Sequence, residues 1–291
     1  MALLLSIIEQ GLIYSILALG IYITYKILDF PDLTVDGSFP LGAAVTVVMI
    51  SSGINPYLTL VASFIAGGLA GLITGIIHVK FKVRDLLSGI ITMTMLYSIN
   101  LHITGSMANV PIFNDPNIFT LSPIYNLVGE YNKLIVIFII SLFCKVAMDL
   151  YLKTKSGYIL RAVGDNEGFV TTLAKDKGVV KIIGLVIANA LVALAGSVMC
   201  QEQRFFDISM GTGAMVIGLA SVIIGTNIFG KLSFLKLTTA VILGSIIYKA
   251  AVGIAISLGL EAIDMKLITG GLFLIMLIIS NFKRTGGNED D

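Results

Sequence analysis

The chain has 291 residues, of which 56% are hydrophobic and 13% charged, and its formal net charge is +1. Ordinary soluble domains carry about a quarter charged residues, so this composition excludes that class and indicates a membrane protein. The near-neutral charge gives no reason to expect a nucleic-acid partner. Both cysteines, Cys144 and Cys200, lie inside apolar runs, where we expect buried thiols rather than a disulfide or a metal site.

Long apolar runs separated by short polar segments predict an all-α polytopic membrane protein with about 8–10 transmembrane helices, because a helix needs about twenty residues to cross a bilayer. In chain order, the expected helices cover 3–27, 40–51, 57–79, 86–103, 133–152, 179–200, 208–229, 232–258 and 267–282. The second run is too short to span unless the polar segment before it also lies inside the protein. We expect one transmembrane domain over 1–285 and a short disordered tail at 286–291.

A polar segment at 29–39 interrupts the apolar sequence early in the chain. A broken helix exposes unpaired backbone groups, which membrane proteins tolerate only against protein or a water-filled cavity. We therefore expect Asp36, Gly37 and Ser38 to border the translocation pathway. The alternative is that Asp36 and Ser38 cap a helix that starts near Pro40.

Lys249 lies near the middle of an expected span and has no acidic residue three or four positions away. It must reach an acid on another helix, with Asp36, Glu9 and Glu202 as candidates, or line a polar cavity. Our hypothesis places Lys249 near the translocation axis, either holding Asp36 or meeting a substrate carboxylate. The competing interpretation is a structural role in which it never meets substrate.

Two further patterns on the spans concern packing. Lys145 and Asp149 are four residues apart and are expected to pair locally near a membrane interface. Gly67, Gly71 and Gly75 lie on one helical face, which favours close helix packing within the chain over a dimer contact.

The longest polar interval, 153–177, carries a concentration of Lys and Arg, which is typical of a cytoplasmic loop. Within it, 158–163 and 169–174 have apolar residues at helical spacing, with a turn expected at Gly164. We predict two short amphipathic helices under the membrane. With this loop inside, the amino terminus is expected outside and the carboxyl terminus in the cytoplasm.

The sequence also contains a weak internal repeat. The segment that starts at Asp32 aligns with the one that starts at Asp207, an offset of 175 residues. The same offset aligns the first expected span with the sixth, the third with the eighth and the fourth with the ninth. The repeats cover about 1–105 and 178–282, and the single span between them makes them run in opposite directions. Inverted repeats with interrupted helices are typical of transporters, although apolar segments can also align by chance.

The pattern Thr154-x-x-Gly157-x-x-x-Arg161-Ala162-x-Gly164-x-Asn166, followed by Ala174, Gly178 and Ala195-Gly196, resembles the coupling loop of ABC-importer permeases. The similarity is to the branched-chain amino acid and ribose permease family. The segments 33–42 and 248–267 resemble the branch of that family associated with tryptophan and tyrosine uptake.

This resemblance implies a membrane subunit of an ATP-driven importer in the bacterial cytoplasmic membrane, with an amino acid, aromatic favoured, as substrate. It implies a homodimer, two cytoplasmic ATPase subunits that hold the ATP and Mg, and an extracytoplasmic binding protein that docks on 106–131 and 201–207. No cofactor and no catalysis are expected in this chain. The residues implied in ATPase coupling are Gly157, Tyr158, Leu160, Arg161, Ala162, Gly164, Asp165, Asn166, Glu167 and Ala174.

Other functions stay open on the sequence. A secondary transporter would also show inverted repeats, but it would have less reason for a folded basic loop. An ABC importer for a nucleoside or a sugar would share most of the same features. A channel or an intramembrane enzyme fits less well, because the former does not explain the loop and the latter needs a catalytic set of residues.

Overall fold

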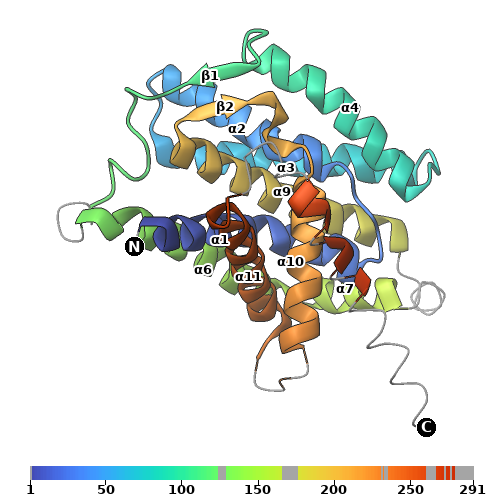
Figure 1. Ribbon diagram of the computed structural model, residues 1–291. Coiled ribbons are helices and arrows are strands. Elements are labelled where there is room, and N and C mark those ends of the chain that lie inside the picture. The colour runs from blue at the N-terminus through green and yellow to red at the C-terminus, as the bar shows by residue number, and fades with distance from the viewer. Residues whose placement is uncertain are drawn as a thin grey trace.

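The computed structural model describes residues 2–123, 129–165, 176–230, 232, 235–259, 267–271, 273–275 and 277–278. Within these ranges the chain is a bundle of helices, and seven of them are long and apolar enough to cross a membrane (Figure 1). They are α1 (Ala2–Ile21) with its π-helical continuation η1 (Tyr22–Ile27), α3 (Pro56–Val79), α4 (Asp85–Ile103), α6 (Asn132–Leu152), α9 (Lys177–Gln203), α10 (Ala214–Phe229) extended by the preceding turn, and α11 (Leu237–Ser257). The described residues of the ninth expected span are helical, whereas the tail lies outside the described residues.

Helix α2 (Val35–Ser51) is shorter than a full span and is largely buried. It begins at Val35, so the expected start near Pro40 is wrong. Pro40 is tolerated in its second turn, although a proline has no N–H to donate to the carbonyl of Asp36. Gly211 packs directly against that carbonyl, which is possible because glycine has no side chain. A Cβ at this position would lie 2.1 Å from the Asp36 oxygen.

Helix α9 is the centre of the bundle and packs against α1, α2 and α3. The α3 glycines predicted to pack within the chain do so. A Cβ on Gly67 would lie 2.3 Å from the Asn189 carbonyl oxygen, and one on Gly71 would lie 2.2 Å from that of Leu185. Gly75 likewise faces Ile182. Backbone therefore meets backbone along this seam, which only glycine permits.

Helices α10 and α11 form a hairpin that packs on α1. Gly225 and Gly244 lie where the two helices cross, each against the backbone of the other. Ser245 of α11 donates a hydrogen bond of 2.8 Å to the Gly11 carbonyl of α1. Helix α4 lies at the edge of the bundle and contacts α2 and α3 (Figure 1).

At one end of the bundle, two short strands add a small sheet to the helical fold. Strand β1 (Asn109–Pro111) pairs antiparallel with β2 (Phe205–Asp207), with Val110 opposite Phe206. The segment after β1 is fixed to α9 because Gln201 accepts the backbone N–H of Ile118 at 3.0 Å. Short 3-10 turns, η2 (Gly129–Tyr131) and η3 (Ile208–Gly211), precede α6 and α10.

At the other end, α7 (Lys155–Asp165) is the first of the two helices expected in the polar loop. The predicted break at Gly164 is wrong, because α7 continues through Gly164 to Asp165. This glycine serves close packing instead, since a Cβ on it would collide with the Ile27 carbonyl at the end of η1. The second expected helix, at 169–174, lies outside the described residues.

Candidate translocation and coupling sites

The break before α2 is organised around a buried carboxylate that the sequence reasoning did not single out. Asp32 is 1% exposed and accepts the backbone N–H of Thr34 at 2.9 Å. It also accepts the side-chain amide of Asn189 on α9 at 2.7 Å. The side-chain oxygen of Asn189, Oδ1, in turn accepts a hydrogen bond from the Ser38 hydroxyl at 2.7 Å. A lone amide in the apolar run of α9 was the available signal, because buried polar groups need partners.

Ser38 and Gly37, two of the expected pathway residues, are buried in these contacts. Ser38 is fully buried and donates to Asn189. Gly37 packs against Leu96 and the backbone of Met93 on α4, and its carbonyl accepts the Asn100 amide at 3.2 Å. Both residues therefore hold α2 to its neighbours α9 and α4.

Asp36 caps a helix, but not its own. Its carboxylate accepts the backbone N–H groups of Gly213 at 3.0 Å and Met215 at 2.8 Å. These donors belong to the amino end of α10, where a carboxylate also interacts favourably with the helix dipole. A residue in the first turn of α2 thus caps the amino end of α10, a helix from the other half of the sequence.

Lys249 is buried in α11 without a carboxylate partner among the described residues. Its Nζ lies 3.8 Å from the centre of the Tyr14 ring and 3.4 Å from the Gln10 side-chain oxygen, both on α1. The expected pair with Asp36 is therefore wrong, and Glu9 and Glu202 are not its partners either. Tyr14 also stacks on Phe39 of α2, with ring centroids 5.9 Å apart, so Tyr14 contacts both Lys249 and α2.

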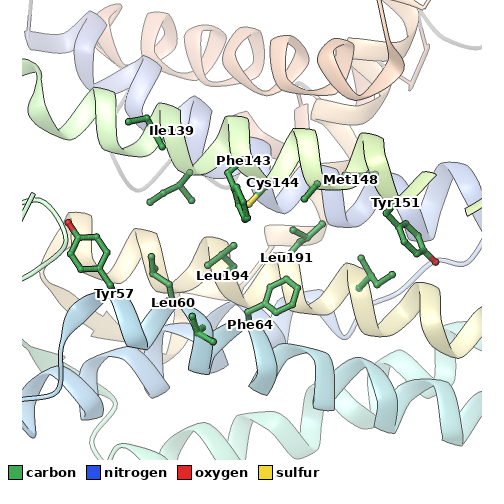
Figure 2. A pocket seen from close by; sticks show the side chains of 14 residues that line it. Tyr57, Leu60, Phe64, Ile139, Phe143, Cys144, Met148, Tyr151, Leu191 and Leu194 are labelled. Carbon is green, nitrogen blue, oxygen red and sulfur yellow. The ribbon is translucent and has the colours of Figure 1, made fainter. Parts of the chain in front are cut away.

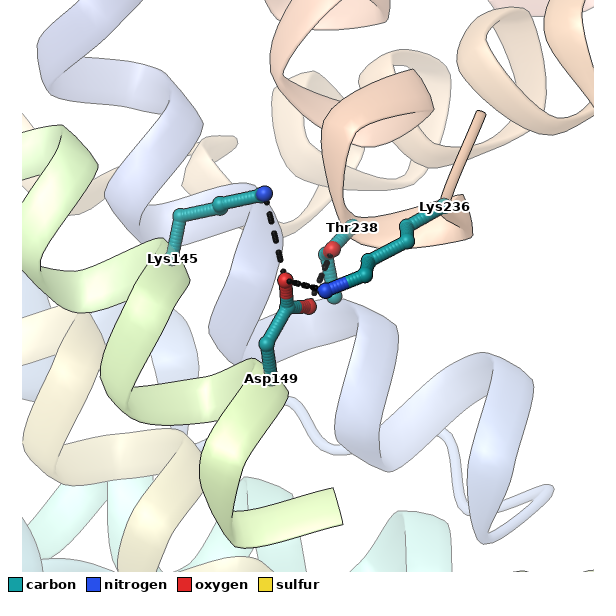
Figure 3. Close-up of polar contacts among 4 residues, drawn as sticks. All are labelled: Lys145, Asp149, Lys236 and Thr238. Carbon is teal, nitrogen blue, oxygen red and sulfur yellow. Dashed lines mark hydrogen bonds and ion pairs between the residues drawn. The ribbon is translucent and has the colours of Figure 1, made fainter. Parts of the chain in front are cut away.

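The predicted pair of Lys145 and Asp149 forms, with a separation of 3.1 Å. It belongs to a larger cluster (Figure 3), because Asp149 also accepts the ammonium of Lys236 at 2.9 Å and the hydroxyl of Thr238 at 2.6 Å. Lys236 and Thr238 lie at the start of α11, so this carboxylate fastens α6 to α11. Sequence spacing could reveal only the contact within α6.

Helix α7 has two distinct faces. Leu160 is fully buried, and Gly157 approaches the carboxyl end of α6 closely, since a Cβ on it would lie 2.4 Å from the Tyr151 oxygen. Tyr158 is 60% exposed and Arg161 is also exposed. Ala162 is partly buried against the core. Asn166, Glu167 and Ala174 lie outside the described residues, as does the Asp165 side chain.

A long apolar groove of about 620 Å³ lies between α3 and α6, and side chains of α9 also line it. Figure 2 shows Tyr57 and Tyr151 at opposite ends of the groove, with Leu60, Phe64 and Phe143 between them. Among the described residues, no group of His, Cys, Asp and Glu could hold a metal ion. The buried polar side chains Asn189, Ser38 and Asn100 instead join helices to one another.

Comparisons with known proteins identify the family of this chain. Residues 3–280 match the family described as branched-chain amino acid transport system / permease component. A tyrosine transport system permease protein of Clostridioides difficile is 45% identical over 96% of this chain and 91% of its own length. An uncharacterized protein of Rickettsia prowazekii is 34% identical over 98% of this chain and 99% of its own length.

More distantly, a ribose import permease protein of Haemophilus influenzae is 25% identical over 78% of this chain and 70% of its own length. No solved structure matches the chain. The family match covers nearly every helix described above, including the break before α2 and helix α7. The chain belongs to the family of branched-chain amino acid transport permeases and is the translocation component of a transport system.

Proposed function

We propose that this permease is the membrane subunit of an ATP-driven ABC importer that takes up an aromatic amino acid, with tyrosine as the first candidate. The observation that supports the substrate is the 45% identity to a tyrosine transport permease over 96% of the chain. A sugar or nucleoside importer is the second candidate, favoured by the 25% identity to a ribose permease. The higher identity and fuller coverage favour the amino acid.

The substrate is tested by reconstituting the permease in proteoliposomes with its ATPase and its binding protein. We expect ATP-dependent uptake of labelled tyrosine, and slower or no uptake of leucine and ribose. Uptake of ribose without uptake of any amino acid would overturn the substrate. ATP-independent uptake by the permease alone would overturn the importer class in favour of a secondary transporter.

The proposed partners are a second copy of the chain, two cytoplasmic ATPase subunits and an extracytoplasmic binding protein. For the ATPase, the two faces of α7 suggest a division of roles. Leu160, Gly157 and Gly164 hold the helix on the bundle, and the exposed Tyr158 and Arg161 touch the ATPase. ATP and Mg would then belong to the partner, with no cofactor in this chain.

Coupling is tested with Arg161→Glu and Tyr158→Ala, because both side chains are exposed. We expect ATPase pull-down and uptake to fall while the melting temperature stays near that of the wild type. Gly164→Pro is a poor test, because it would also disturb the contact with Ile27. Normal pull-down and uptake in both variants would contradict the assignment of α7.

We further propose that the chain is a single domain of two inverted repeats, as its packing suggests. The offset of 175 relates α1 to α9 and α3 to α11, and α3 packs on α9 as α11 packs on α1. It also relates Asp36 to Gly211, which lie against each other. Residues near a two-fold axis contact their own repeat partners, so these two would lie near that axis.

The distribution of basic residues supports our proposed orientation in the membrane. Lys80, Lys82, Lys153, Lys155 and Lys236 lie at the ends of helices near α7, whereas Lys133 and Arg204 lie at the end that carries the small sheet. By the positive-inside rule, the α7 end faces the cytoplasm and the sheet end, with the amino terminus, faces outward. The outer segments 106–131, of which 124–128 lie outside the described residues, and 201–207 are then the proposed docking surface for the binding protein.

We still propose that Asp36, Gly37, Ser38 and Lys249 border the translocation pathway. Their contacts in the structure suggest a specific role for each. Gly37 and Ser38 would shape the break through their contacts with α4 and α9. Asp36 would hold the amino end of α10 in place. Lys249 would supply the positive charge, held beside Tyr14 and not balanced by a carboxylate within the described chain.

A further inference from the structure

A second cleft, of about 550 Å³, opens at the α7 end of the bundle. Four separate elements supply its basic residues: Lys26 from η1, Lys153 from the end of α6, Arg161 from α7 and Lys236 from the start of α11. The cleft is distinct from the apolar groove between α3 and α6, because the two share no lining residue. Its function is not explained by the proposed transport pathway.

The charge of the cleft favours an anion. Among the described residues that line it, Asp149 is the one acid, and Lys145 and Lys236 already engage that carboxylate. No carboxylate of the described chain forms an ion pair with Lys26, Lys153 or Arg161. Cations gathered from four elements repel one another unless an anion or water lies between them, so a bound phosphate would stabilise this end of the bundle.

The position of the cleft favours a lipid over a free anion. Lys26 lies in the last turn of the first span, Lys153 directly follows α6, and Lys236 directly precedes α11. All three lysines therefore lie at the ends of membrane-spanning helices, at the level of phospholipid headgroups. Leu152 and Leu237 also line the cleft, so apolar surface is available for the part of a lipid next to its phosphate.

We propose that this cleft binds the phosphate headgroup of an anionic phospholipid. The bound lipid lies between α7, α6 and the start of α11, and its charge holds these elements together. The site adds a lipid ligand to the proposed importer, and it rests only on the membrane location of the chain. A permease that failed every uptake test would still show this binding.

The experiment uses the purified permease in a neutral detergent and measures binding of short-chain phosphatidylglycerol by native mass spectrometry and by the shift in melting temperature. Short-chain phosphatidylcholine tests the need for net negative charge, and inorganic phosphate tests the need for a lipid. The cleft variant is Lys26→Gln with Lys153→Gln. Its matched control, Lys80→Gln with Lys155→Gln, removes two exposed lysines at the same end that do not line the cleft.

We expect phosphatidylglycerol to bind the wild type and the control alike, and to bind the cleft variant roughly tenfold or more weakly. Equal binding to the cleft variant and the control would overturn the site. An equal melting shift from inorganic phosphate would overturn the lipid assignment, and an equal shift from phosphatidylcholine would overturn the requirement for an anion. Neither cleft lysine is one of the proposed coupling residues, and correct folding of the variant is checked by size-exclusion chromatography.

Discussion

The Asp36 carboxylate accepts the backbone N–H of Gly213 at 3.0 Å, although 177 residues separate the two in the chain. With the second bond, from Met215, it satisfies two of the N–H groups that a helix leaves unpaired at its amino end. Helices α2 and α10 therefore begin beside one another. This contact joins the two halves of the sequence near the proposed two-fold axis.

The first prediction concerns this cap. Asp36→Ala should lower the free energy of unfolding by about 1–2 kcal/mol, because it leaves the amino end of α10 without acceptors. Asp36→Asn should lose less, since its carbonyl oxygen can still accept one bond. Thermal unfolding of the purified permease measures both. Asp85→Ala is the control, because among the described residues the Asp85 side chain accepts one hydrogen bond, from the adjacent Leu86 N–H at an exposed position. A loss as large there would contradict the assignment.

The second prediction concerns Asn189. Asn189→Ala leaves the Asp32 carboxylate buried with one hydrogen bond fewer and should cost about 3 kcal/mol. Asn189→Asp should be worse, because it places a second carboxylate beside the first. Thermal melting of Asp32→Ala, Asn189→Ala and the double variant forms a double-mutant cycle. Strictly additive losses would show that the two side chains do not interact.

Two glycines on α3, Gly71 and Gly68, give the third prediction. Gly71→Ala should destabilise the protein by about 1–3 kcal/mol or more, because its Cβ would lie 2.2 Å from the Leu185 oxygen. Gly68→Ala is the matched control, since its Cβ would lie 3.5 Å from the nearest atom, an ordinary contact. It should be neutral or stabilising by up to about 1 kcal/mol. Equal melting temperatures for the two variants would refute the proposed backbone contact.

The fourth prediction concerns pH at the sheet end. Burial alone would raise the pKa of Asp207, but hydrogen bonds from the Ser209 side chain and backbone and from Asn109 hold that pKa below its ordinary value. A lowered folded-state pKa contributes stability above the unfolded value of about 3.9, and this contribution disappears as the pH falls through the folded pKa. The wild type should therefore melt higher than Asp207→Asn at pH 7, and the difference should shrink as the pH is lowered toward the folded-state pKa of Asp207. A constant difference across this range would contradict the titration.

The last prediction concerns Lys249. Lys249→Met keeps the length of the side chain and removes its charge, so the fold should persist while amino-acid uptake in the reconstituted importer falls several-fold. Lys145→Met is the control for loss of a membrane-depth lysine that pairs with Asp149. Wild-type uptake and wild-type substrate-stimulated ATP hydrolysis in Lys249→Met would exclude a pathway role. In that case the contact with Tyr14 is purely structural.

The sequence was informative wherever a property lies within one segment. Apolar length predicted the spans, and the spacing of Gly67, Gly71 and Gly75 predicted a close-packed face. It could not say which helix fills that face, because periodicity carries no information about partners. For the same reason Lys249 was matched with distant acids, whereas the structure places it over an aromatic ring.

The structural role of a glycine was also predicted incorrectly from the sequence. Gly164 looked like a turn because glycine permits left-handed backbone, yet it lies inside α7, where a missing side chain allows contact with Ile27. A sequence alone does not distinguish these two uses of glycine. The hydrogen-bond donors to Asp36 from α10 and to Asp149 from α11 were not predicted, because these helices lie far along the chain.

The glycine-lined seam between α3 and α9 limits how the permease can move. At Gly67 and Gly71 the backbone of α3 approaches the backbone of α9 directly, so these positions leave little room for sliding or tilting. We therefore expect the two helices to move together during a transport cycle. Any opening and closing is therefore left to surfaces with longer side chains, such as the contacts of α4 with α2 and the start of α11 with α6.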